Sequence, residues 1–423
     1  MRRKAGIGVT AWFVGGAGIF IGVVASWLVS QGNPGNMGVC VACFLRDITG
    51  FFAGVATGQA GTAYIRPEII GIILGAVAAA ALTREFRPRG GSGTLLRFVL
   101  GFIFMVSALI FLGCTVRAWL RLAGGDLNAI WGILGIVAGV VVGIMILKRG
   151  YSLGRSKKVS GVLGWALPAL AIILLVFAGL AAFDSRPTFT TQTTQGAFAT
   201  GDSPPAVFVK EDGVIANVLR PKGAIVTAEG SVVAATGEVL ASAESVSNAR
   251  PQPGGRRAPL AIALVAGLLI GVVAQRTRFC SIGGIRDAIL VRRYDQLFGV
   301  AGLLIGAAVA NVALGQFRLG FENQPVAHMD ILGNFVAMTV ASVAAMMLGG
   351  CPFRQIIVGA EGDFDGFTAV VGMLAGAGFA HWAQLTSSAA GLAPLAWPAI
   401  GVMVVILAAI ALLARRSGAI ARG

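Results

Sequence analysis

The sequence predicts an all-α polytopic membrane protein with about ten transmembrane helices, in two inverted five-helix repeats with re-entrant short helices, plus a small outer β segment. Hydrophobic residues make up 56% of the 423 residues, charged residues only 12%, and the mean hydropathy is +0.83. A soluble domain carries about 25% charged residues. Long apolar runs recur along the chain, and matched motifs divide it into two similar halves.

Ten apolar spans are expected along the chain. The first follows MRRK and is longer than a signal-peptide core, so we interpret it as a retained helix. Five spans belong to a first membrane repeat (1–183) and five to a second (258–423), and an insert (184–257) separates them. The spans are 7–29, 66–82, 98–113, 129–147, 159–183, 258–275, 297–314, 331–349, 366–384 and 396–414.

The basic residues follow the pattern of a chain with both termini in the cytoplasm. Segments that would then face inward hold 21 Lys and Arg, the short outer loops hold five, and the long insert holds seven. Long loops report little on topology, so the first two counts decide the orientation. The net charge of +15 is explained by this topology. No basic segment carries interleaved aromatic residues, so we expect no nucleic-acid partner.

The insert at 184–257 differs from the rest of the chain in composition. It is rich in Thr, Ser, Ala and Val, and turn signals such as Asp212-Gly213 and Lys222-Gly223 separate short alternating runs. This pattern predicts a small β-meander on the outer face. A spacer or stabilising cap and a binding role both remain open for it.

Three pairs of segments show that the membrane part consists of two copies of one unit. The two cysteine motifs are 74 residues apart in the first half and 71 in the second. The pairs are GIFIGVVA (18–25) with GLLIGVVA (267–274), CVACFLRD (40–47) with CSIGGIRD (280–287), and CTVRAWLRLAGGD (114–126) with CPFRQIIVGAEGD (351–363).

An odd number of spans per unit inverts the second copy in the membrane, the plan of many secondary transporters. Cys40 and Cys114 would then lie toward the outer face, and Cys280 and Cys351 toward the inner face. The motif segments are too short and polar to span, so each is expected to form a re-entrant loop and a short helix.

The matched cysteines, each followed by an arginine, predict a path for a soft anion. A single buried cysteine is usually a small apolar residue, but four in matched positions favour weak thiol contacts to a sulfur- or selenium-bearing anion, with a guanidinium to attract it. Direct anion contact and structural ion pairs that pin the loops are both open for the charged residues. These are Arg46, Arg117, Arg286, Arg354, Asp47, Asp126, Asp287 and Asp363.

Cys43 has no counterpart in the second half, where Gly283 stands. With Cys40 it forms Cys-x2-Cys, which suggests a redox pair. Against this, no second pair of neighbouring thiols is expected to relay electrons. His328 and His381 are expected at surfaces or interfaces, without metal-ligand spacing.

The motifs resemble the YeeE/YedE family of sulfur-compound transporters. GNMGVCVACFLRDITG, YIRPEIIG, AQRTRFCSIGGIRD and GGCPFRQ are similar to its YedE selenium-transporter branch. The resemblance covers roughly 1–183 and 258–414. It implies a multi-pass permease of the bacterial inner membrane, related to TsuA-like thiosulfate permeases, in which Cys40, Cys114 and Cys351, and next Cys280, hand the anion on by weak S–H contacts. It also implies a cytoplasmic TusA-like sulfur carrier protein as partner.

Two departures from the family limit these inferences. Its thiosulfate importers rely on fewer cysteines than the five here, so individual roles do not transfer one by one. The insert at 184–257 lies outside the resemblance.

The predicted function is therefore import of a small sulfur or selenium anion, thiosulfate or a selenium species, with membrane lipid as the surroundings. We expect no enzymatic activity, no catalytic residue, no metal and no cofactor. A membrane thiol-disulfide oxidoreductase using Cys40 and Cys43 is the alternative, and a membrane scaffold that docks the outer segment is a third interpretation.

Overall fold

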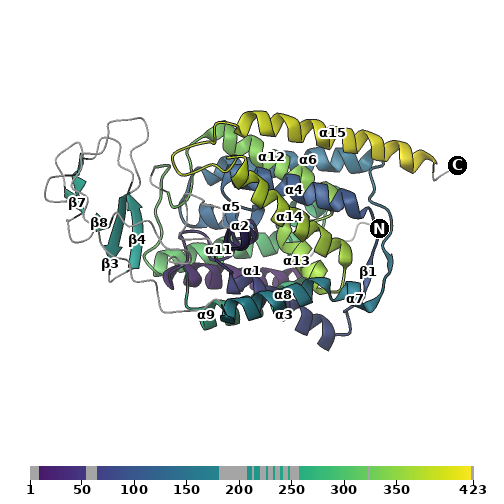
Figure 1. Cartoon of the computed structure of the whole chain (residues 1–423), viewed down its shortest axis with the longest axis horizontal. Helices are drawn as coiled ribbons and strands as arrows, with labels where there is room; N and C mark the ends of the chain where they lie inside the picture. The colour runs from purple at the N-terminus through teal and green to yellow at the C-terminus, as the bar shows by residue number, and fades with distance from the viewer. Residues whose placement is uncertain are drawn as a thin grey trace.

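The computed structural model describes residues 9–53, 64–180, 257–322 and 324–420, together with six short strands between 207 and 247. The membrane part is a bundle of long helices that surround several short ones, and α15 runs along one edge of the bundle (Figure 1). Its helices are α1 (Val9–Ser30), α2 (Val41–Ala53), α3 (Pro67–Leu82), α4 (Thr94–Phe111), α5 (Thr115–Ala123), α6 (Ala129–Lys148), α7 (Gly161–Gly164), α8 (Ala166–Leu180), α9 (Leu260–Thr277), α10 (Ser281–Leu290), α11 (Asp295–Ala313), α12 (Ile331–Leu348), α13 (Pro352–Ala360), α14 (Phe364–Trp382) and α15 (Ala396–Ile420).

Seven helical segments of the described residues are long and apolar enough to cross a membrane, so the chain is a multi-pass membrane protein. Four of them are α1, α6, α11 and α15, and in the other three a long helix is followed by a short one: α4 with α5, α9 with α10, and α12 with α13. The three further predicted spans coincide with α3, α8 and α14. Because α3 and α8 are apolar but shorter, the count of ten spans stays a prediction.

The long helices pack in pairs that correspond between the two halves. α1 lies along α11 as α9 lies along α3, and α6 lies along α12 as α14 lies along α4. Glycines allow this close approach: a Cβ on Gly18 would lie 1.9 Å from the carbonyl oxygen of Gly299, and one on Gly267 would lie 2.2 Å from that of Glu68. Glycine at such contacts lets helix backbones approach closely, as small residues do in membrane proteins.

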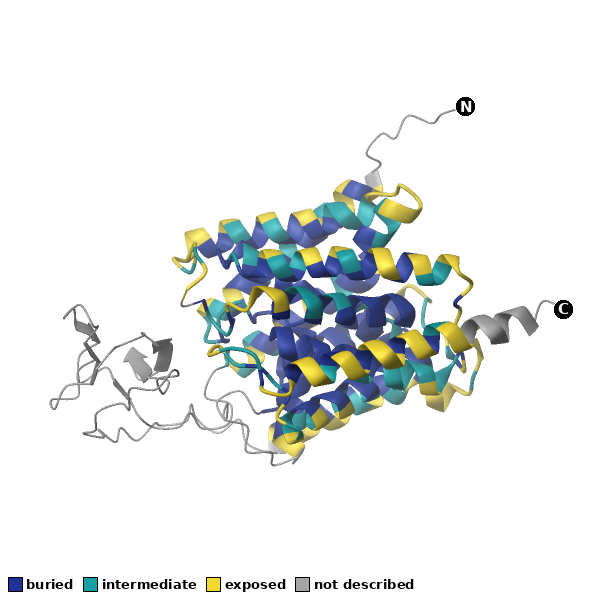
Figure 2. Ribbon diagram, turned by 90° about the horizontal axis from the view of Figure 1, so that it is seen from above, coloured by how far each residue is buried: buried dark blue, intermediate teal, exposed yellow. Residues whose placement is uncertain are grey.

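Burial decreases from the centre of the bundle to its periphery (Figure 2). The short helices α5 and α13 are almost wholly buried. Large apolar side chains are exposed on the outer helices, for example Trp12 on α1 and Val405 on α15. A broad exposed apolar surface of this kind is expected where lipid replaces water.

The strands form small antiparallel sheets. β1 (Arg89–Gly90) pairs with β2 (Lys157–Lys158). The insert contributes β3 (Val207–Glu211), β4 (Val214–Leu219), β5 (Ile225–Val226), β6 (Val232–Val233), β7 (Val239–Ala241) and β8 (Val246–Ser247). The predicted meander is found in the sheet β5-β6-β7, whereas the sheet β4-β3-β8 departs from it because β8 returns beside β3. The remainder of 184–256 lies outside the described residues.

Candidate functional site

Four cysteines occupy the same local position, the residue directly before a short helix. Cys40 precedes α2, and Cys114, Cys280 and Cys351 are the N-caps of α5, α10 and α13. The thiol of Cys280 accepts a hydrogen bond from the backbone N–H of Gly283 at 3.2 Å. Helix N-termini carry partial positive charge, so the four positions place soft sulfur atoms beside groups that favour an anion.

Cys40, Cys43 and Cys114 come together as a first thiol cluster. The Sγ atoms of Cys40 and Cys43 lie 2.7 Å apart, and Cys114 is a neighbour of Cys40. All three side chains are buried. Cys114 is distant from the other two in sequence, so α5 and α2 must meet end to end to form this cluster.

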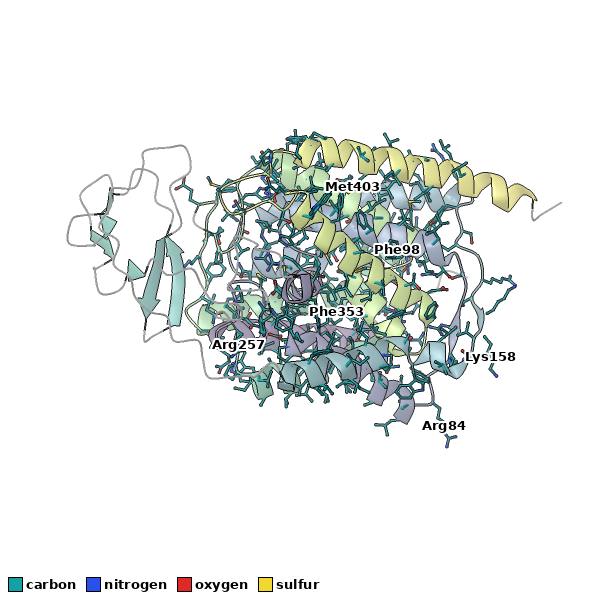
Figure 3. The ribbon with its side chains drawn as sticks, in the orientation of Figure 1. Arg84, Phe98, Lys158, Arg257, Phe353 and Met403 are labelled. Atoms are coloured by element: carbon teal, nitrogen blue, oxygen red, sulfur yellow. The ribbon has the colours of Figure 1, made fainter. Side chains whose placement is uncertain are left out.

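Cys280 and Cys351 form a second thiol cluster, which corrects the expectation that no second pair exists. Their Sγ atoms are 3.5 Å apart, and the backbone N–H of Cys351 donates to the sulfur of Cys280 at 3.4 Å. The ring of Phe353, labelled at the centre of the bundle in Figure 3, packs edge-on against Phe279 at 5.9 Å between centroids. Aromatic rings thus flank the second thiol cluster.

Two hydroxyls connect the thiol clusters. Thr115 directly follows Cys114 and Ser281 directly follows Cys280, and their Oγ atoms are 2.8 Å apart and buried. One cysteine of each thiol cluster is therefore adjacent in sequence to one of the two hydroxyl-bearing residues in this contact. We call the two thiol clusters, together with the buried contact between Thr115 and Ser281, the thiol row.

Arg117 places a buried positive charge against the first thiol cluster. Its guanidinium lies 3.9 Å from the Sγ of Cys43 and donates to backbone carbonyls, including those of Leu112, Asn36 at 3.2 Å and Val326 at 3.3 Å. It forms no ion pair with a carboxylate in the part of the chain that the structure describes. A buried cation that only dipoles stabilise attracts an anion strongly.

Arg46 and Asp47 form the ion pair that the sequence suggested, as part of a larger buried network. Asp47 accepts from Arg46 at 2.6 Å and from Nε of Arg66 at 2.6 Å. Arg66 also approaches Glu68 at 3.9 Å and the amide oxygen of Asn33 at 3.4 Å. This network anchors α2, which carries Cys43, to the start of α3.

Asp126 and Asp363 form ion pairs with arginines other than the four that match between the two halves. Asp126 pairs with Arg121 at 2.6 Å, not with Arg117. Asp363 pairs with Arg89 at 2.6 Å, not with Arg354. The backbone of each aspartate also pairs with a distant segment: Asp126 forms an isolated β-bridge with Gly320, and Asp363 forms one with Arg89. Both aspartates thus form ion pairs, one of the two roles left open for them, and the four matched arginines are left in different surroundings.

A cavity of about 300 Å³ reaches from the second thiol cluster to the surface, and we call it the vestibule. The side chains of Arg278 and Arg293 at its rim are 65% and 71% exposed, whereas Cys280 is 7% exposed. Ion pairs join Arg286 to Asp287 at 2.8 Å and Arg354 to Glu361 at 3.2 Å. The lining residues are Arg278, Cys280, Gly283, Arg286, Asp287, Arg293, Asp295, Gln296, Gly349 and Arg354.

Sequence reasoning missed several residues of this site. Arg66 and Arg121 were counted as loop charges, yet both are fully buried. Thr115 and Ser281 were passed over, although their position directly after a motif cysteine was a usable signal. Of the surface or interface position expected for His328, the surface alternative is wrong, because the ring is buried and contacts the carbonyl oxygen of Ile110 at 3.0 Å.

The fold and site define a multi-pass membrane protein with a thiol-lined interior. No protein-family model matches the chain, and no curated protein matches it either. Within the described ranges, no group of three or more His, Cys, Asp or Glu side chains is arranged to hold a metal ion.

Proposed function

We propose that this chain is a bacterial inner-membrane permease of the YeeE/YedE type, which imports a small sulfur- or selenium-containing anion. The observation that carries the proposal is the row of two thiol clusters joined by the contact between Thr115 and Ser281 at 2.8 Å. A catalytic site would need groups held around one reacting centre, whereas this row extends from one half of the molecule into the other.

The chemistry of the row fits loose binding of a soft anion. Thiols are polarizable and weak hydrogen-bond donors, so each holds the anion without trapping it, as conduction requires. Arg117 supplies the attraction at the first thiol cluster, and the basic vestibule supplies it at the second. An anion passing along the row would exchange one set of S–H contacts for the next.

The packing of the long helices supports the inverted repeat. The correspondence of α1–α11 with α9–α3, and of α6–α12 with α14–α4, is what two copies related by an axis in the membrane plane require. With both termini in the cytoplasm, the first thiol cluster faces outward and the vestibule opens inward. A cytoplasmic TusA-like sulfur carrier would then receive its cargo at the vestibule.

Uptake of radiolabelled thiosulfate into proteoliposomes tests the proposal, with unlabelled selenium anions as competitors. Cys351→Ala is expected to abolish uptake, because it removes half of the second thiol cluster. Ser342→Ala is the matched control, since that hydroxyl is buried but has no hydrogen-bond partner in the described structure. Wild-type uptake equal to that of empty liposomes for every anion would refute the proposal.

A membrane thiol-disulfide oxidoreductase is the second candidate, and the contact of Cys280 with Cys351 at 3.5 Å favours it more than the sequence did. Two thiol pairs, one in each half, could pass electrons by successive disulfide exchange. This candidate predicts that Cys40 and Cys43 cycle between dithiol and disulfide while no anion crosses. Thiol trapping during turnover therefore separates the two functions.

A further inference from the structure

Glu68 is a buried carboxyl group that the thiol row does not use. It lies in the first turn of α3 and is 1% exposed. One carboxyl oxygen accepts a hydrogen bond from the side-chain amide of Asn33 at 2.7 Å. The other oxygen has no hydrogen-bond partner among the described residues. A buried carboxylate with an unpartnered oxygen is costly, and binding a proton removes that cost.

The charges around Glu68 leave it only partly compensated. On α2, Asp47 forms short ion pairs with both Arg46 and Arg66, each at 2.6 Å. Glu68 is left with a longer contact of 3.9 Å to Nη1 of Arg66. The hydroxyl of Tyr64 accepts from the same guanidinium at 3.0 Å.

The elements on the other sides of Glu68 bring one positive charge, that of Arg257, which lies near Tyr64. From α9, the uncharged Gly267 packs on its backbone. Ahead of α9, Arg257 stacks over the ring of Tyr64 at 5.7 Å. The partial compensation by Arg66 is therefore the main electrostatic contact of Glu68, and a carboxyl in such surroundings can exist in either protonation state.

Glu68 is also connected to the first thiol cluster. Asn33, which donates to it, begins the segment whose carbonyl oxygens at Gly35 and Asn36 accept hydrogen bonds from Arg117. Arg117 in turn contacts the Sγ of Cys43. A change in the charge of Glu68 would thus act, through Asn33, on the segment that accepts hydrogen bonds from Arg117.

Anion import also needs a source of energy. Moving one negative charge into a cell whose interior is negative costs about 2.3 kcal/mol per 100 mV. A proton that enters with the anion offsets one charge. A titratable group linked to the thiol row could bind that proton, and Glu68 has such a link through Asn33 and Arg117.

We infer that Glu68 is a proton-binding site that couples entry of the anion to the proton gradient, an inference that rests on the proposed function. The carboxylate takes up one proton from the outer side when an anion enters the first thiol cluster. It gives the proton up toward the inner side once the anion has moved on, and returns to the carboxylate form.

The test compares wild type with Glu68→Gln in proteoliposomes held at zero membrane potential. For one coupled proton, an inward gradient of one pH unit is expected to raise thiosulfate accumulation in the wild type about tenfold. Glu68→Gln is expected to lose this response and still exchange labelled for unlabelled thiosulfate, which shows that it is folded. Glu85→Gln is the matched control, because Glu85 is a partly exposed carboxyl that should not affect coupling.

Each outcome decides the inference. Retention of the full pH response by Glu68→Gln, or thiosulfate uptake by the wild type that ignores the gradient, would overturn it. If the wild type takes up no anion, the proposed function fails. Infrared difference spectra between two pH values then still test whether Glu68 binds a proton. A carboxylic-acid band that appears on acidification and is missing in Glu68→Gln supports the site, and no difference between the two proteins refutes it.

Discussion

Arg117 and Arg354 occupy the same motif position in the two halves, yet we predict that only one of them governs anion binding. Arg117 is fully buried, forms no ion pair in the described part of the chain and lies 3.9 Å from the Sγ of Cys43. Arg354 is paired with Glu361 at 3.2 Å at the edge of the vestibule. Changing each to Gln removes the charge and keeps a hydrogen-bond donor, so the pair of variants isolates the electrostatic contribution.

The size of the effect follows from the geometry. An anion seated on the thiol of Cys43 would lie about 4 Å from the guanidinium, and at an effective dielectric constant of 20 such a pair is attracted by about 4 kcal/mol. Desolvation reduces this to the 1.5–3 kcal/mol or so typical of a charge-assisted hydrogen bond. Since about 1.4 kcal/mol is a factor of ten, Arg117→Gln should lower uptake efficiency about 10- to 100-fold.

Initial rates of thiosulfate uptake over a concentration series give the comparison. Arg354→Gln is expected to change uptake efficiency by no more than about fivefold, because the charge of Arg354 is already neutralised by Glu361, which keeps a contact of 3.6 Å with Arg89 in the variant. Unchanged thermal unfolding of both variants would show that the effect lies in the path. Equal losses for the two variants, or a larger loss for Arg354→Gln, would refute the reasoning.

Three further predictions concern packing, the central contact and pH. Gly18→Ala, whose Cβ would lie 1.9 Å from a carbonyl of α11, should lower stability by about 1–3 kcal/mol in detergent unfolding, whereas Gly16→Ala, which meets nothing within 4 Å, should not. Thr115→Val leaves the hydroxyl of Ser281 unpartnered, a cost of about 1–3 kcal/mol, and should reduce uptake severalfold where Thr115→Ser does not. Burial lowers the pKa of His328, so its contribution to stability is present above the ordinary value of about 6.5 and is lost as the pH falls through the lowered pKa. The melting temperature should therefore drop on acidification, and less so in His328→Gln.

Contrary results would be specific. Equal stability of the two glycine variants would show that α1 and α11 separate easily. Full uptake by Thr115→Val would remove the hydroxyl pair from the path. A melting temperature with the same pH dependence in wild type and His328→Gln would show that His328 is not the group that titrates.

The sequence predicted the apolar helices and the short helices that follow the matched cysteines, because apolar length and repeated motifs can be recognised along the chain. Each predicted apolar span coincides with a helix, and each of the four matched cysteines directly precedes a short helix. The Arg46–Asp47 and Arg286–Asp287 ion pairs could also be predicted from the sequence, since adjacent residues can pair regardless of the fold.

Contacts between distant segments were not predictable in the same way. The meeting of Cys280 with Cys351 depends on how α10 and α13 approach each other, which no spacing along the chain records. Asp126 pairs with Arg121, five residues earlier, a pairing that the motif comparison did not single out. Charge counting placed Arg66 in a loop, because composition does not distinguish a solvated arginine from one buried on Asp47.

The two halves carry the same motif in different surroundings, and this asymmetry bears on how a symmetric chain could move an anion in one direction. The first thiol cluster is enclosed, since its three cysteines are buried, and the neighbouring Arg117 donates to the carbonyl groups of both Asn36 and Val326. The second opens into the vestibule, where Arg354 is turned to Glu361 instead. In an inverted repeat, exchanging the conformations of the halves would open the first cluster and close the second. If the chain is the permease proposed above, release of the Arg117 contacts would open the first thiol cluster, and an arriving anion would compete with those carbonyl groups for the guanidinium.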